Sequence, residues 1–173
     1  MSMLHQFKNI NTIVLDVDGV LTDGTLLVMP GGLMVRRMNI KDGYAIQLAV
    51  KKGYHVAIIS GGDSAEVKDR LQKLGVTDVF MKVHDKLSVL QEYLLLNGLD
   101  AANTAYMGDD MPDYDVMKAV GMATCPADAA TEIRELSGYV SPLNGGAGCV
   151  RDLIEKIMRV RGDWSEDTTV RSQ

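Results

Sequence analysis

The feature of this sequence that most constrains its fold is an alternation of short apolar segments with segments of helical periodicity. Short, continuous runs of apolar or β-branched residues are typical of strands buried in a parallel sheet. Such runs occur at residues 12–15, 56–59, 79–81, 104–107 and 122–124. Between and after them, apolar residues recur at the spacings of amphipathic helices, as in Val67/Leu71/Leu74, Leu87/Leu90/Leu94 and Val150/Leu153/Ile154/Ile157/Met158. This order predicts an α/β fold with a doubly wound, mainly parallel sheet.

Length and charge limit the kind of protein this chain can be. Its 173 residues are enough for a substantial core, so we expect a single domain over residues 1–173. The net charge of −5 supplies no broad basic surface for nucleic acid. No segment approaches the roughly 18 apolar residues of a membrane span. Cys125 and Cys149 stand singly, as buried thiols do in a reducing compartment. We therefore expect a cytoplasmic protein with a small-molecule ligand.

Polar residues follow the predicted strands where they end. In open α/β sheets ligands bind at the carboxyl ends of the strands, and the residues found there are Asp16 and Asp18, Ser60, Lys86 at the start of a helix, and Asp109, Asp110 and Asp113. Grouped carboxylates repel one another without a cation, and oxygen ligands suit a hard divalent ion such as Mg²⁺. Because Mg²⁺ is commonly bound through one or two carboxylates plus substrate oxygens, the pattern favours a phosphate ligand.

The order and placement of these residues resemble the four motifs of the haloacid dehalogenase superfamily of phosphohydrolases. The matching residues are Asp16-x-Asp18-Gly19, Ser60, Lys86 and Gly108-Asp109-Asp110-x-x-Asp113, so that the resemblance spans nearly the whole chain. It implies a Rossmann-like sheet and the hydrolysis of phosphate monoesters. By the same resemblance, Asp16 is the nucleophile that forms an aspartyl-phosphate, while Asp18 protonates the leaving alkoxide and then acts as base toward water.

The resemblance also implies a metal site and a phosphate site. Mg²⁺ would be held by Asp16, the backbone carbonyl of Asp18 and Asp109, where it offsets the repulsion between two anions. Ser60 and Lys86 would hold the phosphoryl oxygens as a neutral donor and a fixed cation.

Several of these residues have plainer alternative interpretations. Asp110 and Asp113 would lie behind the reacting groups, with Asp113 orienting Lys86 or a metal-bound water, but an Asp after a strand is often only a helix cap or turn former. Ser60 before two glycines could serve the turn alone. Lys86 could be a solvated helix residue, as most lysines are.

A projecting hairpin and a polar tail flank this core. Residues 25–37 form two strand-like runs around Pro30-Gly31-Gly32, which predicts a β-hairpin over about 25–38. Too few residues separate Gly19 from the first clear helix, near Gly43, for a large cap domain. A capless site must be closed by a bulky substrate or by a neighbouring subunit, and an apolar hairpin favours the second. Residues 164–173 are polar and aperiodic, which predicts a mobile tail.

Finer features resemble one branch of the superfamily, the phosphatases of 3-deoxy-D-manno-octulosonate 8-phosphate. The matching segments are residues 16–24, 39–44 and 145–152. The resemblance implies a homotetramer, in which hairpins and tails enclose a neighbour's site, and a role in lipopolysaccharide precursor synthesis. It also implies substrate contacts from Asp18, Arg70 and Lys86 and from a loop that consists of Asn39, Ile40, Lys41, Asp42 and Gly43.

Two departures from this branch concern the substrate carboxylate. The branch often has Arg where this chain has Gly62 and Ala147. The carboxylate contact is therefore left open among Lys41, Arg70, Lys82 and a neighbour's Arg171.

Two rival functions fit parts of the pattern. A phosphatase for a nine-carbon keto-deoxy sugar acid 9-phosphate would use the same core motifs. A signalling receiver domain also places an acidic cluster, a Ser or Thr and a Lys around a phosphorylated Asp, but its acidic pair follows the first strand and its phosphorylated Asp ends a later one. Here Asp16 and Asp18 precede Gly19, which favours the phosphatase.

Overall fold

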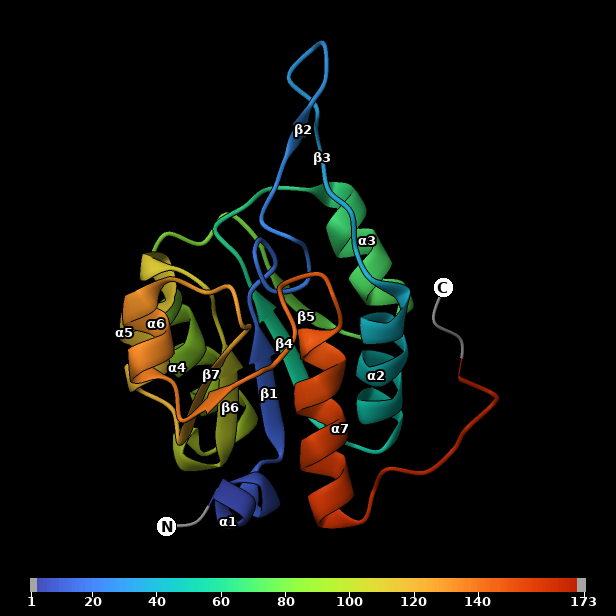
Figure 1. Cartoon of the computed structure of the whole chain (residues 1–173), viewed down its shortest axis with the longest axis vertical. Coiled ribbons are helices and arrows are strands. Elements are labelled where there is room, and N and C mark those ends of the chain that lie inside the picture. Colours follow the sequence, from blue (N-terminus) through green and yellow to red (C-terminus); the bar gives the residue numbers. More distant parts are fainter. Residues whose placement is uncertain (1–2, 171–173) are drawn as a thin grey trace.

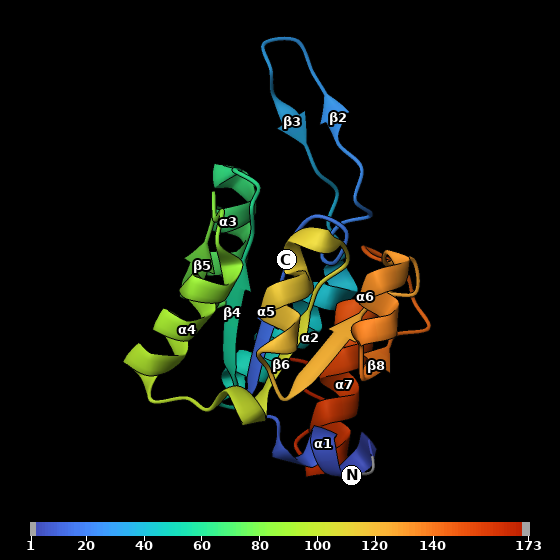
Figure 2. The same ribbon diagram turned by 90° about the vertical axis from the view of Figure 1, so that its left-hand side faces the viewer.

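The computed structural model describes residues 3–170 and is built around one parallel sheet. Six strands lie in the order β5-β4-β1-β6-β7-β8, and each pairs in parallel with its neighbours. Figures 1 and 2 show helices on both sides of this sheet. The strands are β1 (Thr12–Leu15), β4 (His55–Ile59), β5 (Asp78–Phe80), β6 (Thr104–Met107), β7 (Met122–Cys125) and β8 (Tyr139–Val140). The predicted doubly wound α/β fold is confirmed.

Each face of the sheet has its own hydrophobic core, because successive strand residues point to opposite faces. In β1, Ile13 and Leu15 join one core while Val14 joins the other, and all three are fully buried. The first core contains side chains from α1 (Met3–Asn9), α2 (Ile40–Lys51), α3 (Ala65–Lys73) and α7 (Cys149–Arg161). The second contains side chains from α4 (Lys86–Asn97), α5 (Tyr114–Lys118) and α6 (Thr131–Leu136). Burial on both faces explains why the strands are continuous apolar runs.

The strand order makes β1 the point where the topology reverses. From β1 the chain builds β4 and β5 on one side, then returns to place β6, β7 and β8 on the other. A crevice forms at the carboxyl ends of the strands at such a switch point, and it is the common ligand site of open α/β sheets. Asp16 is the first residue after β1 and therefore lies at the mouth of this crevice.

The predicted hairpin is present and separate from the main sheet. Its strands, β2 (Leu27–Val28) and β3 (Met34–Val35), pair antiparallel and form their own two-stranded sheet. Figures 1 and 2 show it projecting beyond the ends of the main strands. No cap domain lies between β1 and α2, because these two short strands are the secondary structure found there in the described chain.

Some elements differ from the sequence predictions. The expected loop over residues 39–43 is wrong, because α2 begins at Ile40 and Asn39 is its N-cap, with Oδ1 accepting from Lys41 N–H at 2.8 Å. The short elements α1, α5, α6 and β8 were not predicted from the sequence, nor were the 3₁₀ turns η1 (Ala101–Asn103) and η2 (Met111–Asp113). Among residues 3–170, no helix combines the length and apolar character that a membrane crossing requires.

Asp42 links α2 to α7. The first residues of α7 follow Gly148, which provides no side-chain cap, and Asp42 Oδ1 instead accepts from Arg151 N–H at 2.7 Å. The side chain is buried, with 1% of the residue exposed. Burial raises the pKa of Asp42 to about 6, although hydrogen bonds from the Arg151 and Gly148 backbone oppose this rise.

The raised pKa of Asp42 predicts a pH-dependent cost to stability. The folded protein retains this proton more tightly than the unfolded chain, so the Asp42 contribution falls as pH rises from about 4 through about 6. An Asp42→Asn variant keeps an acceptor for Arg151 N–H but cannot ionise. We expect its free energy of unfolding, relative to wild type, to increase between pH 4 and pH 7, as measured by denaturant unfolding at each pH.

The contributions of the other carboxyl groups to the pH dependence of stability cancel when the variant is compared with wild type. Asp42→Ala is the matched control for loss of the hydrogen bond to Arg151 N–H. That variant should lose about 0.5–2 kcal/mol relative to Asp42→Asn. Stability curves for wild type and Asp42→Asn that run parallel over this pH range would contradict the prediction.

Candidate active site

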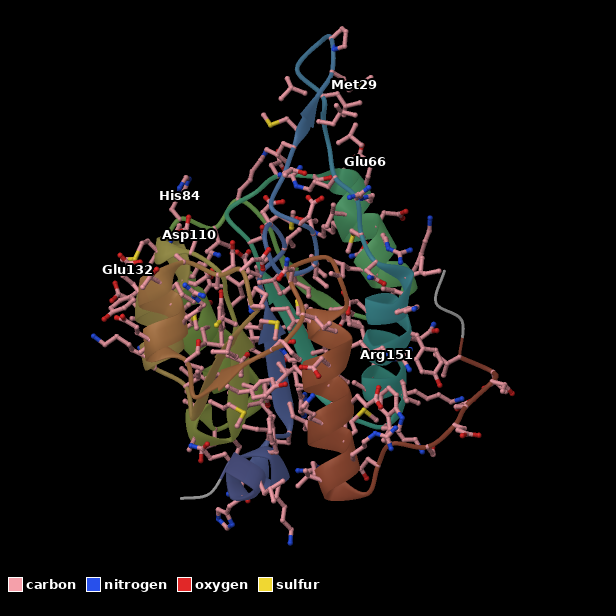
Figure 3. The ribbon with its side chains drawn as sticks, viewed as in Figure 1. Met29, Glu66, His84, Asp110, Glu132 and Arg151 are labelled. Atoms are coloured by element: carbon pink, nitrogen blue, oxygen red, sulfur yellow. The ribbon has the colours of Figure 1, made fainter. Side chains whose placement is uncertain are left out.

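A cavity of about 290 Å³ opens at the carboxyl ends of β1, β4 and β6. It brings together residues that are far apart in the sequence, and His84 and Asp110 lie together on the same side of the molecule in Figure 3. The polar residues expected from the four motifs all line it, namely Asp16, Asp18, Ser60, Lys86, Asp109, Asp110 and Asp113. Asp16, Ser60, Lys86 and Asp113 are buried.

Lys86 connects two of the carboxylates. It is the first residue of α4, and Asp85 caps this helix by accepting from Ser88 N–H at 3.0 Å. Lys86 Nζ lies 2.9 Å from Asp16 Oδ2 and 2.7 Å from Asp113 Oδ1. Burial lowers the pKa of Lys86, but the charges of Asp16 and Asp113 outweigh it and raise the pKa overall. Lys86 is therefore a fixed cation inside the site, not a solvated helix residue.

The structure separates the roles of Asp110 and Asp113. Asp110 Oδ1 accepts from Met111 N–H at 2.8 Å and caps η2, which is the plain alternative interpretation. Asp113 makes no side-chain cap for α5. Its Oδ1 accepts from Lys86 and, at 2.9 Å, from the Tyr106 hydroxyl, while its Oδ2 accepts from Asp109 N–H at 3.1 Å. Asp113 thus orients Lys86 and the Asp109 backbone.

Tyr106 was predicted only as a strand residue, and its hydroxyl is a part of the site that was not expected from the sequence. The residue lies in β6 and is fully buried. A buried tyrosine hydroxyl usually finds a hydrogen-bond partner, so a Tyr within an otherwise apolar strand was a signal that could have pointed to Asp113.

The carboxylates form a cluster that fits a metal ion. Oxygens of Asp16, Asp109 and Asp113 all lie within 4.8 Å of one another. Burial and the charge of Asp113 raise the pKa of Asp16 to about 7, against the effect of Lys86. Burial and the charges of Asp16 and Asp113 raise the pKa of Asp109 to about 7. A single ammonium opposes three carboxylates, so a divalent cation suits the charge that remains.

The donors left for that cation follow from the contacts. Asp113 accepts three hydrogen bonds on its two oxygens, whereas Asp16 accepts from Val17 N–H through Oδ1 and pairs with Lys86 through Oδ2. Asp16 and Asp109 therefore keep more lone pairs for a cation than Asp113 does, and both line the cavity. The Asp18 carboxylate binds Arg36 instead, with Nε 2.7 Å from Oδ1 and Nη2 3.1 Å from Oδ2. Its backbone carbonyl would be the Asp18 ligand, as expected from the sequence. Arg36 is a further residue whose place in the site was not expected from the sequence.

Ser60 serves both the turn and the cavity. Its backbone N–H donates to Phe80 O at 2.9 Å, and its Oγ accepts from Gly62 N–H at 3.1 Å. Because Oγ acts as acceptor in the turn, its own hydrogen can be donated into the cavity.

The loop after β1 is fixed by residues distant from it. Thr22 Oγ1 accepts from Gly19 N–H and from Gly24 N–H, each at 3.2 Å. The C-terminal glycine run packs directly underneath, where a Cβ on Gly145 would lie 1.9 Å from Gly19 O. Gly146 N–H also donates to Val20 O at 3.0 Å. The glycines of residues 145–148 thus allow the close backbone approach that supports the loop carrying Asp18.

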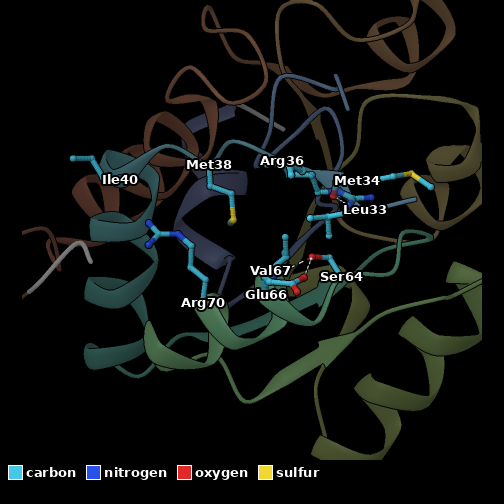
Figure 4. A pocket seen from close by; sticks show the side chains of 10 residues that line it. Leu33, Met34, Arg36, Met38, Ile40, Ser64, Glu66, Val67 and Arg70 are labelled. Carbon is cyan, nitrogen blue, oxygen red and sulfur yellow. Dashed lines mark hydrogen bonds between the residues drawn. The ribbon is translucent and has the colours of Figure 1, made fainter. Parts of the chain in front are cut away.

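The expected substrate residues are divided among different places. Asp18 and Lys86 line the active-site cavity. Ile40 and Arg70 line a second cavity of about 400 Å³ between the hairpin and α3 (Figure 4). Lys41 lines a third, of about 390 Å³, beside α7.

The remaining expected contacts face elsewhere. Asn39 Nδ2 donates to Gly146 O at 3.1 Å, and Gly43 is buried in α2. The expectation that Asp42 lines the substrate pocket is wrong, because its buried carboxylate is committed to the first turn of α7. Lys82 Nζ pairs with Asp63 at 2.8 Å on the surface.

The tail contacts the body of the protein over the residues that are described. The Trp164 ring packs edge-on against Tyr44 with centroids 6.2 Å apart, and Lys51 Nζ lies 2.6 Å from Asp167 Oδ2. Figure 1 shows this segment running beside α2. Mobility of the tail stays a prediction, and Arg171 lies outside the described residues.

Comparison with known proteins identifies the family. No protein-family model matches the chain. The 3-deoxy-D-manno-octulosonate 8-phosphate phosphatase KdsC of Escherichia coli strain K12 is 35% identical over 164 residues, 95% of this chain and 87% of the relative. The chain belongs to this phosphatase family. The family membership confirms the resemblance drawn from the four motifs and excludes the receiver-domain alternative.

Solved structures of KdsC-family phosphatases have the same fold. The structure of the Yersinia pestis phosphatase has a TM-score of 0.90 at 32% sequence identity. The match covers 92% of this chain and 86% of the Yersinia pestis chain. The Moraxella catarrhalis phosphatase, solved in complex with magnesium ion, phosphate ion and a KDO molecule, has a TM-score of 0.89 at 29% identity, with 92% of each chain covered.

The carboxylate cluster predicts that Mg²⁺ stabilises the protein. A ligand that binds only the folded state raises the free energy of unfolding by RT ln(1 + [L]/Kd). We expect added Mg²⁺ to raise the melting temperature of wild type and to have a much smaller effect on Asp109→Asn, as measured by scanning calorimetry. Asp115→Asn, an exposed position on α5, makes the same change in charge and should respond as wild type does. Equal responses from all three proteins would contradict a metal site at Asp109.

Proposed function

We propose that this protein hydrolyses 3-deoxy-D-manno-octulosonate 8-phosphate to the free sugar acid and inorganic phosphate, with Mg²⁺ as cofactor and Asp16 as nucleophile. The observation that carries the proposal is the setting of Asp16. It directly follows the central strand, pairs with buried Lys86 at 2.9 Å, and shares a cluster with Asp109. The names of the KdsC relatives supply the substrate, and the bound ions and sugar of the Moraxella catarrhalis structure support Mg²⁺ and the products.

The reaction proceeds in two displacements at phosphorus. In the first, an Asp16 carboxylate oxygen bonds to phosphorus as the bond to the sugar oxygen breaks, and Asp18 gives its proton to that oxygen. In the second, Asp18 takes a proton from water as the water oxygen attacks phosphorus, which releases phosphate and restores the Asp16 carboxylate. Ser60 and Lys86 hold the phosphoryl oxygens.

Mg²⁺, bound by Asp16, Asp109 and the Asp18 carbonyl, would neutralise the charge between the phosphate and the attacking carboxylate. The buried Lys86 keeps its charge throughout, because two carboxylates hold it. Asp113 in turn keeps Lys86 in place, so it contributes through Lys86 and does not contact the substrate.

The sugar part of the substrate needs room beyond the phosphate site. The cavity of about 400 Å³ beside Arg36 provides such room, and Arg70 on its wall is a cation suited to a sugar acid. We propose Ile40 and Arg70 as contacts of the sugar.

We also propose that the protein works as a homotetramer in the cytoplasm, within lipopolysaccharide precursor synthesis. The hairpin supports assembly, because its apolar side chains are exposed to an extent that monomeric proteins avoid. Leu27 is 62% exposed and Val28 is 70% exposed, and Met29 lies near the hairpin tip (Figure 3).

The chemistry is tested by a phosphate-release assay over sugar phosphates, with and without Mg²⁺. Wild type should release phosphate from the eight-carbon sugar acid phosphate only with Mg²⁺, and faster than from the nine-carbon analogue. Asp16→Asn should lower kcat on the order of 10³-fold or more, because an amide cannot act as the nucleophile. Asp115→Asn is the control. Wild-type turnover by Asp16→Asn would refute the mechanism, and preference for the nine-carbon substrate would refute the substrate.

Assembly is tested separately, by sedimentation velocity of the double variant Leu27→Asp/Val28→Asp. Carboxylates at these two hairpin positions should dissociate the tetramer, because burying an unpaired charge in an apolar contact between subunits costs free energy. Exposed Leu95→Asp/Leu96→Asp on α4 is the matched control and should sediment as wild type does. A wild-type protein that is monomeric and fully active would disprove the proposed assembly and leave the chemistry standing.

A further inference from the structure

The hairpin delivers one side chain into the active site. Arg36 follows β3 directly, and its guanidinium forms a fork with Asp18, with Nε 2.7 Å from Oδ1 and Nη2 3.1 Å from Oδ2. The Arg36 side chain is 6% exposed and that of Asp18 is 34% exposed. A bidentate pair of this kind fixes the plane of a carboxylate as well as its position. Figure 4 shows Arg36 on the wall of the cavity beneath the hairpin.

Gly62 leaves the space in which this pair forms. A Cβ built on Gly62 would lie 2.9 Å from Asp18 Oδ2 and 3.0 Å from Arg36 Nη2, and 3.4 Å from Ser60 Oγ. The first two separations are shorter than real Cβ atoms normally have from such neighbours. Any side chain at this position would therefore require the ends of Asp18 and Arg36 to shift from the positions in which they pair.

The fork leaves Asp18 able to exchange protons. A carboxylate offers about four lone-pair sites on its two oxygens, and the two hydrogen bonds from Arg36 occupy two of them. Within residues 3–170, these are the hydrogen bonds that the structure shows to the Asp18 carboxylate. Its orientation thus depends on the hairpin and not on the strand that carries its backbone.

We propose that Arg36 is a positioning residue, which aims the Asp18 carboxylate at the leaving oxygen and so couples the hairpin to the proton transfer. The proposal rests on the proposed function, in which Asp18 protonates that oxygen. It assigns to the hairpin a role inside its own subunit, in addition to the proposed contact with another copy.

The leaving group provides a readout that a purely structural role would not affect. An alkyl phosphate such as the sugar phosphate leaves as a strongly basic alkoxide and needs a proton, whereas an aryl phosphate leaves as a stable phenolate and does not. The value of kcat/KM reports the steps up to departure of the leaving group. A misplaced Asp18 should therefore lower kcat/KM for the sugar phosphate and spare the aryl phosphate.

The experiment measures kcat/KM for both substrates with the full-length, Mg²⁺-loaded protein. Arg36→Ala should lower the value for the sugar phosphate about 10- to 100-fold, and for p-nitrophenyl phosphate less than about 3-fold. Arg36→Lys should fall between, because an ammonium cannot form the fork. Arg37→Ala is the matched control, since the neighbouring Arg37 side chain is 89% exposed and pairs with Asp23 on the surface. Equal losses on both substrates, or none, would overturn the proposal.

Gly62→Ala tests the same contact with both charges retained. It should show the same selective loss, and adding Gly62→Ala to Arg36→Ala should cause little further loss, because both act on one interaction. Additive losses in the double variant would show that the two residues act independently and would overturn the proposal. Melting temperatures of all variants identify any general loss of folding.

A role for Arg36 in binding the substrate carboxylate is distinguished by product inhibition. The free sugar acid should inhibit aryl phosphate hydrolysis by Arg36→Ala with an inhibition constant within about 2-fold of wild type, because positioning of Asp18 does not affect binding of the acid. A constant weakened by 10-fold or more would assign Arg36 to the carboxylate instead and overturn the proposal. Failure of the proposed function is separate, since wild type would then not hydrolyse the sugar phosphate or Asp16→Asn would remain active.

Discussion

The buried ion pairs of Lys86 are the interactions on which the rest of the site depends. Lys86 and Asp16 have side chains that are 5% and 9% exposed, and Asp113, the second partner of Lys86, is 1% exposed. Buried charges are stable only when paired, and removing one partner of such a pair typically costs about 3–5 kcal/mol. The network nevertheless holds more negative than positive charge, so the fold keeps a site whose remaining requirement is a cation. This unbalanced charge is what prepares Asp16 for a metal and a phosphate.

The fold supports this unfavourable cluster by fixing the backbone around it. The central strand brings Asp16 to the switch point, and the loop that follows is held by Thr22 and by the glycines near residue 145. These contacts oppose any movement of the backbone that would let the carboxylates separate and reduce their repulsion. Preorganisation of this kind is how active sites lower the cost of charge development during reaction.

The sequence predicted the parts of the site that depend on local patterns. A carboxylate after a continuous apolar strand is visible without knowledge of the fold, which is why Asp16 and Asp109 were identified. Contacts between distant segments were not predictable in this way. Asp42 is separated by 109 residues from the backbone group that it caps. Its place in a segment that resembles the 8-phosphate phosphatases suggested a pocket, whereas packing of α2 on α7 buries it. The hairpin was predicted from its Pro-Gly-Gly turn, but no local pattern shows that Arg36 at its base pairs with Asp18.

Asp18 is where the two parts of the chain meet. Its backbone follows β1 and is set by the sheet, while its carboxylate is held by Arg36 and is set by the hairpin. In a protein without a cap domain, the hairpin is the element that extends furthest beyond the site, and its exposed apolar side chains lie only a few residues from Arg36. A contact that restrains the outer part of the hairpin would therefore also restrain the fork at its base, and so link the proposed subunit contact to the proposed proton donor, Asp18.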